Sequence, residues 1–438
     1  MKVDVVLLVE HVARELDIAC AIKHLIECRH GLSLVLATRY HDIEKTLRRY
    51  EPQAVVVPYC YAGGPWSDVL SRWPNIPYIN LAYEQLFSTL TSGYKIPKGV
   101  FPKERVLHVG WGDFYRDHLL SHGVQPQNIV VNGNPSYALY RKPYSRYFDT
   151  RDDLALRHGL DSGRRWVFVP ENFGIVFVEP DRLKGYAGAM GEDKVRVWRE
   201  NTVKSFQEVA RWWRAAAESG GVEVIVRPRP AIPDETFRAG VVEAIGPLPT
   251  HLHILKDGTV KEWNLASDLV LSNYSTTLVE AAVAGKPVFM LEPLPFPDFV
   301  RADWHDLVGR LKTQAEFLEA TKHPPADASR ALKRHAEELM MAHGDAIGNL
   351  ADLIADVVLL RRPVPPVPGI ECLPEEIANV QPVRKACWAV RYLLGRVKEA
   401  VLGQQIDTWH KDDILDQADL ARRMARWKYA LDPERVGT

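Results

Sequence analysis

The sequence predicts an α/β protein built from two Rossmann-like, doubly wound domains, followed by C-terminal helices. Short runs rich in valine, isoleucine and leucine alternate with segments of helical periodicity, which is the pattern of β-α-β units around a parallel sheet. The alternation occurs twice, on either side of a polar, charged segment at residues 141–165. The length of 438 residues suggests two to three domains, because a domain typically takes roughly 100–200 residues.

The first domain is predicted over residues 1–150. Its opening run, 3–9, is short and β-branched, as expected of a parallel strand buried on both faces. Residues 13–28 then carry apolar side chains at helical spacing, and Gly31 ends this helix. The remaining predicted elements are a helix at 41–50 and strands at 32–37, 54–58, 78–81, 105–109 and 128–131.

The second domain is predicted over residues 151–362 and begins with a strand at 166–169. A long helix at about 195–219 follows, with its apolar and tryptophan side chains on one face. The remaining predicted elements are strands at 222–226, 253–254, 269–271 and 287–291, and a helix at 278–284. The second half therefore repeats the architecture of the first half without repeating its sequence.

Residues 363–438 are predicted to form a proline-rich strap and C-terminal helices. Five prolines lie within residues 361–374, which excludes a helix there. Helical spacing returns at 383–402, where five basic residues accompany one acidic residue, and again at 413–429. A basic amphipathic helix is typical of proteins that contact an anionic membrane. The alternative hypothesis is that the C-terminal helices brace the two domains.

Composition excludes several classes of protein. The 55 basic and 56 acidic residues nearly balance, whereas nucleic-acid-binding proteins usually carry a basic excess. No apolar run approaches the roughly 20 residues of a membrane-spanning helix. The opening residues have aspartate inside the apolar run, so we interpret them as a strand and not as a signal peptide. We expect a cytoplasmic location, with attachment to the inner face of the membrane as a second hypothesis.

The sharpest motif is LVLSNYSTTLVEAAVAGKPVFMLEP, at residues 269–293. A strand ends at Leu271, and hydroxyl residues then open a helix, whose free backbone N–H groups can bind a phosphate. The alternative is that Ser275 merely caps the helix. The residues assigned to nucleotide or phosphate binding in this motif are Asn273, Ser275, Thr276, Thr277 and Glu280.

This motif resembles the "ST…EA…G.P" signature of nucleotide-sugar glycosyltransferases of the two-Rossmann (GT-B) kind. It is particularly similar to bacterial surface carbohydrate biosynthesis proteins of capsule and O-antigen loci. Residues 129–135 (IVVNGNP), 167–173 (VFVPENF) and 343–354 (HGDAIGNLADLI) resemble further segments of that family. The resemblance implies two domains facing a central cleft. It also implies transfer of a sugar from a nucleotide-sugar to a growing surface polysaccharide or lipid-linked glycan.

Two arginines extend the predicted phosphate site. The string VIVRPRP, residues 224–230, is a strand that runs into two prolines. Capsule transferases that use CMP-sugars often carry a His-Pro pair at this place, where this chain has Arg229 and Pro230. Arg227 and Arg229 are candidates for phosphate binding, because a guanidinium is a permanently charged fork of donors. The donor is expected to be a nucleotide-sugar, with a CMP-activated sugar as one option.

Glycosyl transfer needs a carboxylate or histidine that deprotonates the acceptor or attacks the sugar. Acidic residues that follow predicted strands are the candidates, because ligands of doubly wound sheets bind beyond the carboxyl ends of the strands. The candidate catalytic residues are Glu10, Glu84, Asp113 and Glu171.

We expect no catalytic metal and no cofactor. The 15 histidines form no HExxH pattern and no paired cluster with cysteine, and no DxD motif occurs. Other functions remain open for this fold. They are a nucleotide-sugar 2-epimerase, a polyol-phosphate transferase and a non-catalytic sugar-binding subunit. The epimerases resemble the chain less, since their "R..TERPE" segment is only echoed around residues 292–298.

Overall fold

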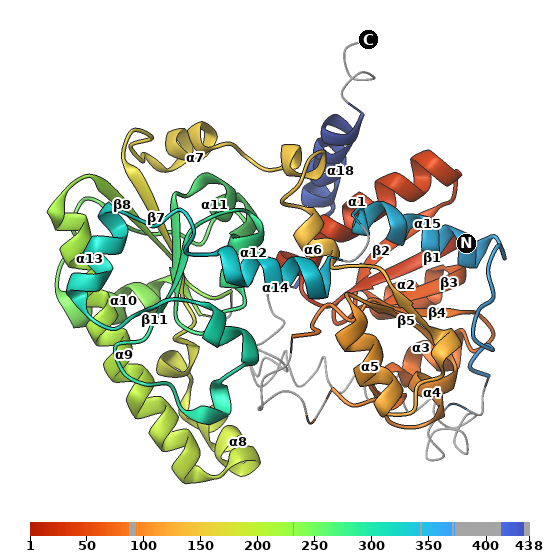
Figure 1. The fold of residues 1–438 in the computed structure, drawn as a ribbon. Helices are drawn as coiled ribbons and strands as arrows, with labels where there is room; N and C mark the ends of the chain where they lie inside the picture. The colour runs from red at the N-terminus through yellow and green to blue at the C-terminus, as the bar shows by residue number, and fades with distance from the viewer. Residues whose placement is uncertain are drawn as a thin grey trace, which may run out of the picture. The chain divides into compact units, whose positions relative to one another are not determined.

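A computed structural model describes residues 1–86, 93, 95–230, 232–341, 344–369, 372 and 413–432 of the chain. The chain divides into two compact units. Unit 1 contains Met1–Gln85, Gly93–Ala138 and the described residues from Met341 onward. Unit 2 contains Leu139–Met340. Each unit is an α/β structure around its own sheet (Figure 1).

Unit 1 is built on a six-stranded parallel sheet of order β2-β1-β3-β4-β5-β6. Its strands are β1 (Lys2–Val9), β2 (Leu34–Thr38), β3 (Glu51–Val57), β4 (Tyr78–Asn80), β5 (Val106–Gly110) and β6 (Ile129–Val131). Its described helices are α1 (Val12–His30), α2 (Ile43–Arg49), α3 (Ser67–Arg72), α4 (Val100–Glu104), α5 (Asp113–Ser121), α6 (Pro135–Ala138), α15 (Ala346–Val358) and α18 (Gln417–Leu431).

Unit 2 repeats the plan with a six-stranded parallel sheet of order β12-β11-β10-β7-β8-β9. Its strands are β7 (Arg165–Pro170), β8 (Val222–Arg227), β9 (Leu252–Ile254), β10 (Leu269–Ser272), β11 (Val288–Leu291) and β12 (Arg310–Leu311). Its described helices are α7 (Arg151–His158), α8 (Pro180–Met190), α9 (Glu192–Ser219), α10 (Asp234–Ile245), α11 (Val260–Ala266), α12 (Thr277–Val283), α13 (Gln314–Lys322) and α14 (Arg330–Met340).

Both central strands are buried on both faces, which explains their nearly uninterrupted apolar sequences. In β1, every side chain from Val5 to Val9 is fully buried. In β7, the side chain of Phe168 stacks on Trp263 of α11 on one face of the sheet. Val167 and Val169 belong to the core on the other face, which the apolar side of α9 completes. Helices therefore cover both faces of the sheet, which is the doubly wound arrangement.

The strand order reverses beside the first strand of each sheet. In unit 1, β2 pairs with one edge of β1 and β3 with the other. In unit 2, β8 and β10 flank β7 in the same way. Such a switch point opens a crevice outside the carboxyl ends of the two strands, where doubly wound proteins bind ligands. The crevices lie beyond β1 and β3 in unit 1, and beyond β7 and β10 in unit 2.

The predicted fold class of two doubly wound α/β units with C-terminal helices is confirmed. One helix, α7, lies inside the segment 141–165 that the sequence suggested to be a connection. Thr150 accepts a hydrogen bond from the backbone of Asp153 and so caps this helix. The predicted helix at 413–429 corresponds to α18. The predicted helix at 383–402 lies outside the described residues.

The compact units differ from the predicted boundaries in two places, because unit 2 already includes residues 139–150 and no longer includes the residues after 340. The sequence placed residues up to 362 in the second domain, whereas α15 packs on α1 and belongs to unit 1. The reason is the apolar surface of α15, since most of its residues are buried. Among the described residues, no helix is both long enough and apolar enough to cross a membrane.

A buried ion pair attaches α18 to α1, which lie together in Figure 1. The guanidinium of Arg423 binds the carboxylate of Asp17, whose side chain is only 4% exposed. Arg423 also binds Asp419 at 2.8 Å within α18. Loss of one partner from a buried pair is costly because the other charge stays in a low-dielectric site.

We predict that Arg423→Met lowers the free energy of unfolding of unit 1 by about 2–4 kcal/mol. Arg422 is the matched control, because it also binds Asp419 but its side chain is 73% exposed. Arg422→Met should therefore change stability by less than about 0.5 kcal/mol. Denaturant titration of both variants measures the difference, and equal effects would contradict the structural role of the Arg423–Asp17 pair.

Candidate functional site

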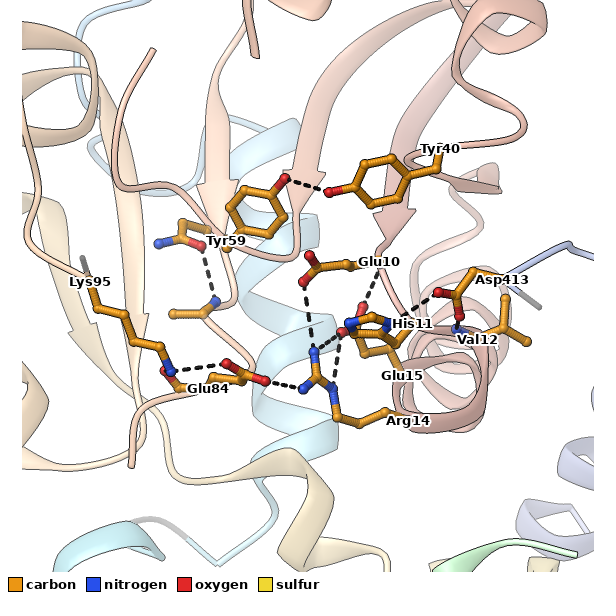
Figure 2. A network of polar contacts seen from close by, with 12 residues as sticks. Glu10, His11, Val12, Arg14, Glu15, Tyr40, Tyr59, Glu84, Lys95 and Asp413 are labelled. Carbon is orange, nitrogen blue, oxygen red and sulfur yellow. Dashed lines mark hydrogen bonds and ion pairs between the residues drawn. The ribbon is translucent and has the colours of Figure 1, made fainter. Parts of the chain in front are cut away.

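The crevice of unit 1 is surrounded by polar side chains that directly follow its strands. Glu10 and His11 follow β1, Tyr40 lies shortly after β2, Tyr59 follows β3, and Glu84 lies shortly after β4. Figure 2 shows these side chains gathered at one edge of the sheet. The parallel sheet brings them together because all its strands end on the same side.

Arg14, in the first turn of α1, is the centre of this cluster. Its guanidinium lies 2.8 Å from Glu15 and 3.7 Å from Glu10. It also forms an ion pair with Glu84 (Figure 2). Lys95 binds the same Glu84 carboxylate at 3.0 Å. Three carboxylates and two cations therefore form one continuous network, which joins two of the four predicted catalytic residues, Glu10 and Glu84.

The network shifts the pKa values of Glu10 and Glu84 in opposite directions. Burial, together with the neighbouring Glu15 carboxylate, raises the pKa of Glu10 to about 7. Burial also acts against ionisation of Glu84, but the charges of Arg14 and Lys95 outweigh it and lower its pKa to about 2. One acid is therefore held ionised while the other exchanges its proton near neutral pH. This division is characteristic of acid–base sites.

The C-terminal segment reaches this crevice. Asp413 accepts the backbone N–H of Val12 at 2.8 Å, and its other oxygen lies 2.9 Å from Nδ1 of His11. Burial acts to lower the pKa of His11, but the hydrogen bond to Asp413 outweighs it and raises that pKa. Asp413 thus caps α1 and orients the imidazole beside Glu10 (Figure 2).

The other two predicted catalytic carboxylates lie apart from this network. Asp113 is exposed at the start of α5, where it binds Arg116 at 2.6 Å. Glu171 belongs to unit 2, where its buried carboxylate accepts the backbone N–H groups of Phe173 at 2.6 Å and of Arg229 at 2.7 Å. Burial raises the pKa of Glu171. Its hydrogen bonds indicate that Glu171 shapes the turns after β7 and β8.

At the switch point of unit 2, two asparagines from the loops after β7 and β10 bind each other. The side-chain oxygen of Asn273 accepts the backbone N–H of Asn172 at 2.8 Å, and its amide nitrogen donates to the Asn172 carbonyl at 2.8 Å. Ser272 adds a hydrogen bond from its hydroxyl to the carbonyl of Pro170. These bonds hold the carboxyl ends of β7 and β10 together at the switch point.

The two predicted arginines take different roles. Arg227 is buried and donates to the carbonyls of Lys256 and Asp257, so it holds the loop after β9. Burial lowers the pKa of Arg227 to about 10. Arg229 is exposed. Its guanidinium lies beside Gly174, where a side-chain carbon would come within 3.1 Å of it. Arg229 is therefore the better placed of the two to meet a phosphate.

The hydroxyl residues of the 269–293 motif surround the start of α12, Thr277–Val283. Ser275 accepts the backbone N–H of Thr277 at 3.3 Å and donates to its hydroxyl at 3.1 Å. The N-cap residue, Thr276, is exposed and makes no capping bond. Further along α12, Glu280 accepts the hydroxyl of Tyr140 at 2.8 Å. Phosphate binding at these residues stays a prediction.

Several residues of the two crevices were not selected as site residues from the sequence. Tyr59 and Asn172 each lie two residues after the end of a strand, but the rule that identified Glu10 considered acidic residues alone and therefore did not select them. No local sequence pattern marks Arg14 and Lys95 as site residues, because each belongs to the site through its ion pair with Glu84, which is not adjacent in sequence. Asp413 lies about 400 residues from its partners, and nothing local marks it.

The raised pKa of Glu10 predicts a pH dependence of stability. The pKa of Glu10 rises from a usual value of 4.5 to about 7 in the folded state. Between these two pH values the folded protein therefore binds more protons than the unfolded chain. Stability from Glu10 is therefore present below pH 4.5 and is lost as the pH rises through 7. Relative to the wild type, Glu10→Gln should gain stability over this range, by at most about 3 kcal/mol.

Denaturant titrations from pH 4 to 8 measure this difference. Glu84 supplies a control of opposite sign, because its lowered pKa contributes stability that is present above pH 4.5 and is lost as the pH falls towards 2. Glu84→Gln should thus be most destabilising at neutral pH. A Glu10→Gln difference that does not change with pH would contradict the assignment.

Comparisons with known proteins place this fold among two-Rossmann enzymes. No protein-family model matches the chain, and no curated protein matches it. Among solved structures, S. aureus MnaA with UDP matches at TM-score 0.50 and 13% identity, over 82% of this chain and 97% of that one. A putative UDP-N-acetylglucosamine 2-epimerase from Listeria monocytogenes matches at TM-score 0.50 and 12% identity, over 83% and 99%.

The wall teichoic acid polymerase TagF, soaked with CDPG, matches at TM-score 0.53 and 10% identity, over 82% of this chain and 90% of that one. At such low identities the likeness concerns the fold alone. The chain therefore has the α/β architecture of GT-B enzymes, in which two doubly wound sheets succeed one another along the chain.

Proposed function

We propose that this protein is a glycosyltransferase that moves a sugar from a nucleotide-sugar donor to an acceptor glycan without a catalytic metal. The observation that carries the proposal is the network of Glu10, Arg14 and Glu84 at the switch-point crevice of unit 1. It supplies a carboxyl group whose pKa is close to neutral. An acceptor hydroxyl can be deprotonated efficiently by a base with such a pKa.

The donor is proposed to bind at the crevice of unit 2. MnaA was solved with UDP and TagF was soaked with CDPG, so this fold accepts nucleotides in both proteins. In this chain, exposed Arg229 and the hydroxyl groups of residues 275–277 offer donors suited to a diphosphate or monophosphate. A CMP-activated sugar is one candidate, although this chain has Arg229 and Pro230 where capsule transferases that use CMP-sugars often carry a His-Pro pair.

The proposed mechanism assigns proton transfer to Glu10. Ionised Glu10 takes the proton of the acceptor hydroxyl, and Arg14 favours that ionised form by its positive charge. Glu84 stays ionised and neutralises Arg14 and Lys95. Arg229 and the hydroxyl residues stabilise the charge on the departing nucleotide. The remaining rate enhancement comes from holding donor and acceptor in orientation.

The biological product is proposed to be a bacterial surface polysaccharide of the capsule or O-antigen kind, or its lipid-linked precursor. The protein would act in the cytoplasm, at the inner face of the membrane where a lipid-linked acceptor lies. A donor panel distinguishes this function from the others of the fold. Incubation with UDP-, CMP-, GDP- and CDP-linked donors in EDTA should give sugar transfer from one of them. Epimerisation, polyol-phosphate transfer or binding without turnover would each contradict the proposal and favour the corresponding alternative function.

We predict that Glu10→Gln lowers kcat by roughly 10²–10⁴-fold and removes the acidic limb of the pH–rate profile. Glu27→Gln is the matched control, because Glu27 is an exposed carboxylate on the same helix, α1, paired with Lys23. It should leave the rate near normal. If Glu10→Gln keeps a near-normal rate while Asp113→Asn or Glu171→Gln abolishes turnover, the base lies elsewhere.

We further predict that Ser275→Ala combined with Thr276→Ala weakens nucleotide binding about tenfold or more while the unit stays folded. Thr313→Ala is the control, because Thr313 caps α13 through the backbone N–H of Glu316. That variant should cost about 1 kcal/mol of stability and leave the nucleotide Kd unchanged. Calorimetric titration with UDP, CMP, CDP and GDP compares the two. Unchanged affinity of the double variant for every nucleotide that binds would remove the phosphate site.

A further inference from the structure

We propose that His24, Cys28 and Asp432 form a zinc site that fastens the end of the C-terminal helix α18 to α1. Contrary to the expectation from the sequence that no histidine pairs with a cysteine, His24 and Cys28 are one turn apart on α1, so their side chains lie on the same face of the helix. Asp432 directly follows α18, which packs on α1. The site thus joins two elements about 400 residues apart in sequence, and it is independent of the proposed glycosyl transfer.

The three side chains present one nitrogen, one sulfur and one oxygen to a common point. Nε2 of His24 lies 3.2 Å from Oδ2 of Asp432. Sγ of Cys28 lies 3.8 Å from the ring nitrogens of His24. All three ligand atoms are within 4.8 Å of one another.

These separations are close to those of a metal tetrahedron. With zinc bonds of about 2.3 Å to sulfur and about 2.0 Å to nitrogen and oxygen, the edges are about 3.5 Å for sulfur–nitrogen and about 3.3 Å for nitrogen–oxygen. The observed edges of 3.8 and 3.2 Å differ from these by a few tenths of an ångström. These two edges therefore fit one ion, and the remaining sulfur–oxygen edge lies within 4.8 Å, compared with about 3.5 Å in the tetrahedron.

The chemistry of the ligands selects the metal. A thiolate, an imidazole and a carboxylate suit Zn²⁺, whereas Mg²⁺ and Ca²⁺ prefer oxygen ligands alone. His24 is buried, so packing fixes the position of its imidazole, whereas Cys28 is exposed, so this side of the site is open to solvent. The open side gives an ion access and leaves the fourth position to water.

The competing explanation is an ordinary ion pair between His24 and Asp432, with the thiol of Cys28 only hydrogen-bonded to His24. His30 provides the comparison, because it forms a similar pair with Asp352 at 2.8 Å on the same helix. Among the described residues, a thiol lies at ligand distance from both a histidine and a carboxylate at His24, and the His30–Asp352 pair has no such thiol.

The position of the site indicates a structural role. His24 lies 12 residues beyond the start of α1, which is about 18 Å along the helix axis from the crevice that contains Glu10. A metal there stabilises α18, whose Arg423 binds Asp17 in the second turn of α1. It thereby helps to hold the described C-terminal segment, including Asp413, against α1.

Cobalt substitution tests the proposal on the full-length chain under reducing conditions. Titration of the metal-free protein with Co²⁺ should give the visible bands of a four-coordinate ion and a near-ultraviolet band from thiolate ligation, at about one equivalent per chain. Zn²⁺ should displace Co²⁺ and abolish both bands. It should also raise the Tm of the transition that includes unit 1 by several degrees.

Single variants assign the ligands. Cys28→Ser should remove the near-ultraviolet band, and His24→Gln and Asp432→Asn should each weaken Zn²⁺ binding by about tenfold or more. His30→Gln is the matched control and should leave both readouts unchanged. The proposal is overturned if Co²⁺ gives no thiolate band, if His30→Gln weakens binding as much as His24→Gln, or if Zn²⁺ leaves the Tm unchanged.

Discussion

Parallel pairing brings the carboxyl ends of all strands of a sheet to one edge, and the candidate site of this protein depends on that constraint. Each first strand, β1 or β7, has neighbours whose chain order reverses across it. The connections therefore leave in opposite directions and open a crevice. The residues that follow these strands, Glu10 in unit 1 and Asn172 in unit 2, meet side chains from distant parts of the chain for this reason.

Within the crevice of unit 1, one guanidinium organises the electrostatics. Arg14 binds Glu15 and Glu84 directly and lies farther from Glu10. A carboxylate in direct contact with a cation keeps its charge at low pH, whereas a more distant one responds mainly to burial and to like charge. The same arginine therefore fixes Glu84 as a permanent anion and leaves Glu10 able to exchange a proton. This difference of distance is the reason why Glu10, rather than Glu84, is proposed as the base.

Helix α1 connects the crevice with the C-terminal part of the chain. Its start receives Asp413, its second turn binds Arg423 through Asp17, and His24, two turns further along, lies beside Asp432. These three contacts, at different turns of α1, hold the described C-terminal segment along this helix. The acidic and basic residues that make them are buried or half-buried, so removal of one partner would leave the other polar group in a low-dielectric site.

The sequence by itself determined the α/β class, the doubly wound order of strands and helices, and the positions of most strands. These properties depend on local periodicity and on the apolar composition that burial requires, both of which are visible along the chain. It also indicated Glu10 and Glu84, because acidic residues beyond strand ends are marked locally.

Only the tertiary structure decided which charges meet. The pairing of Arg14 with Glu84, of Asp413 with His11, and of α15 with unit 1 joins segments that no short-range pattern relates. The tertiary structure also gave the two arginines of the 224–230 segment different environments. Arg227 donates to backbone carbonyls, whereas Arg229 is exposed. The physical reason is that burial of apolar faces fixes where elements lie, while the partner of a long charged side chain follows from that packing.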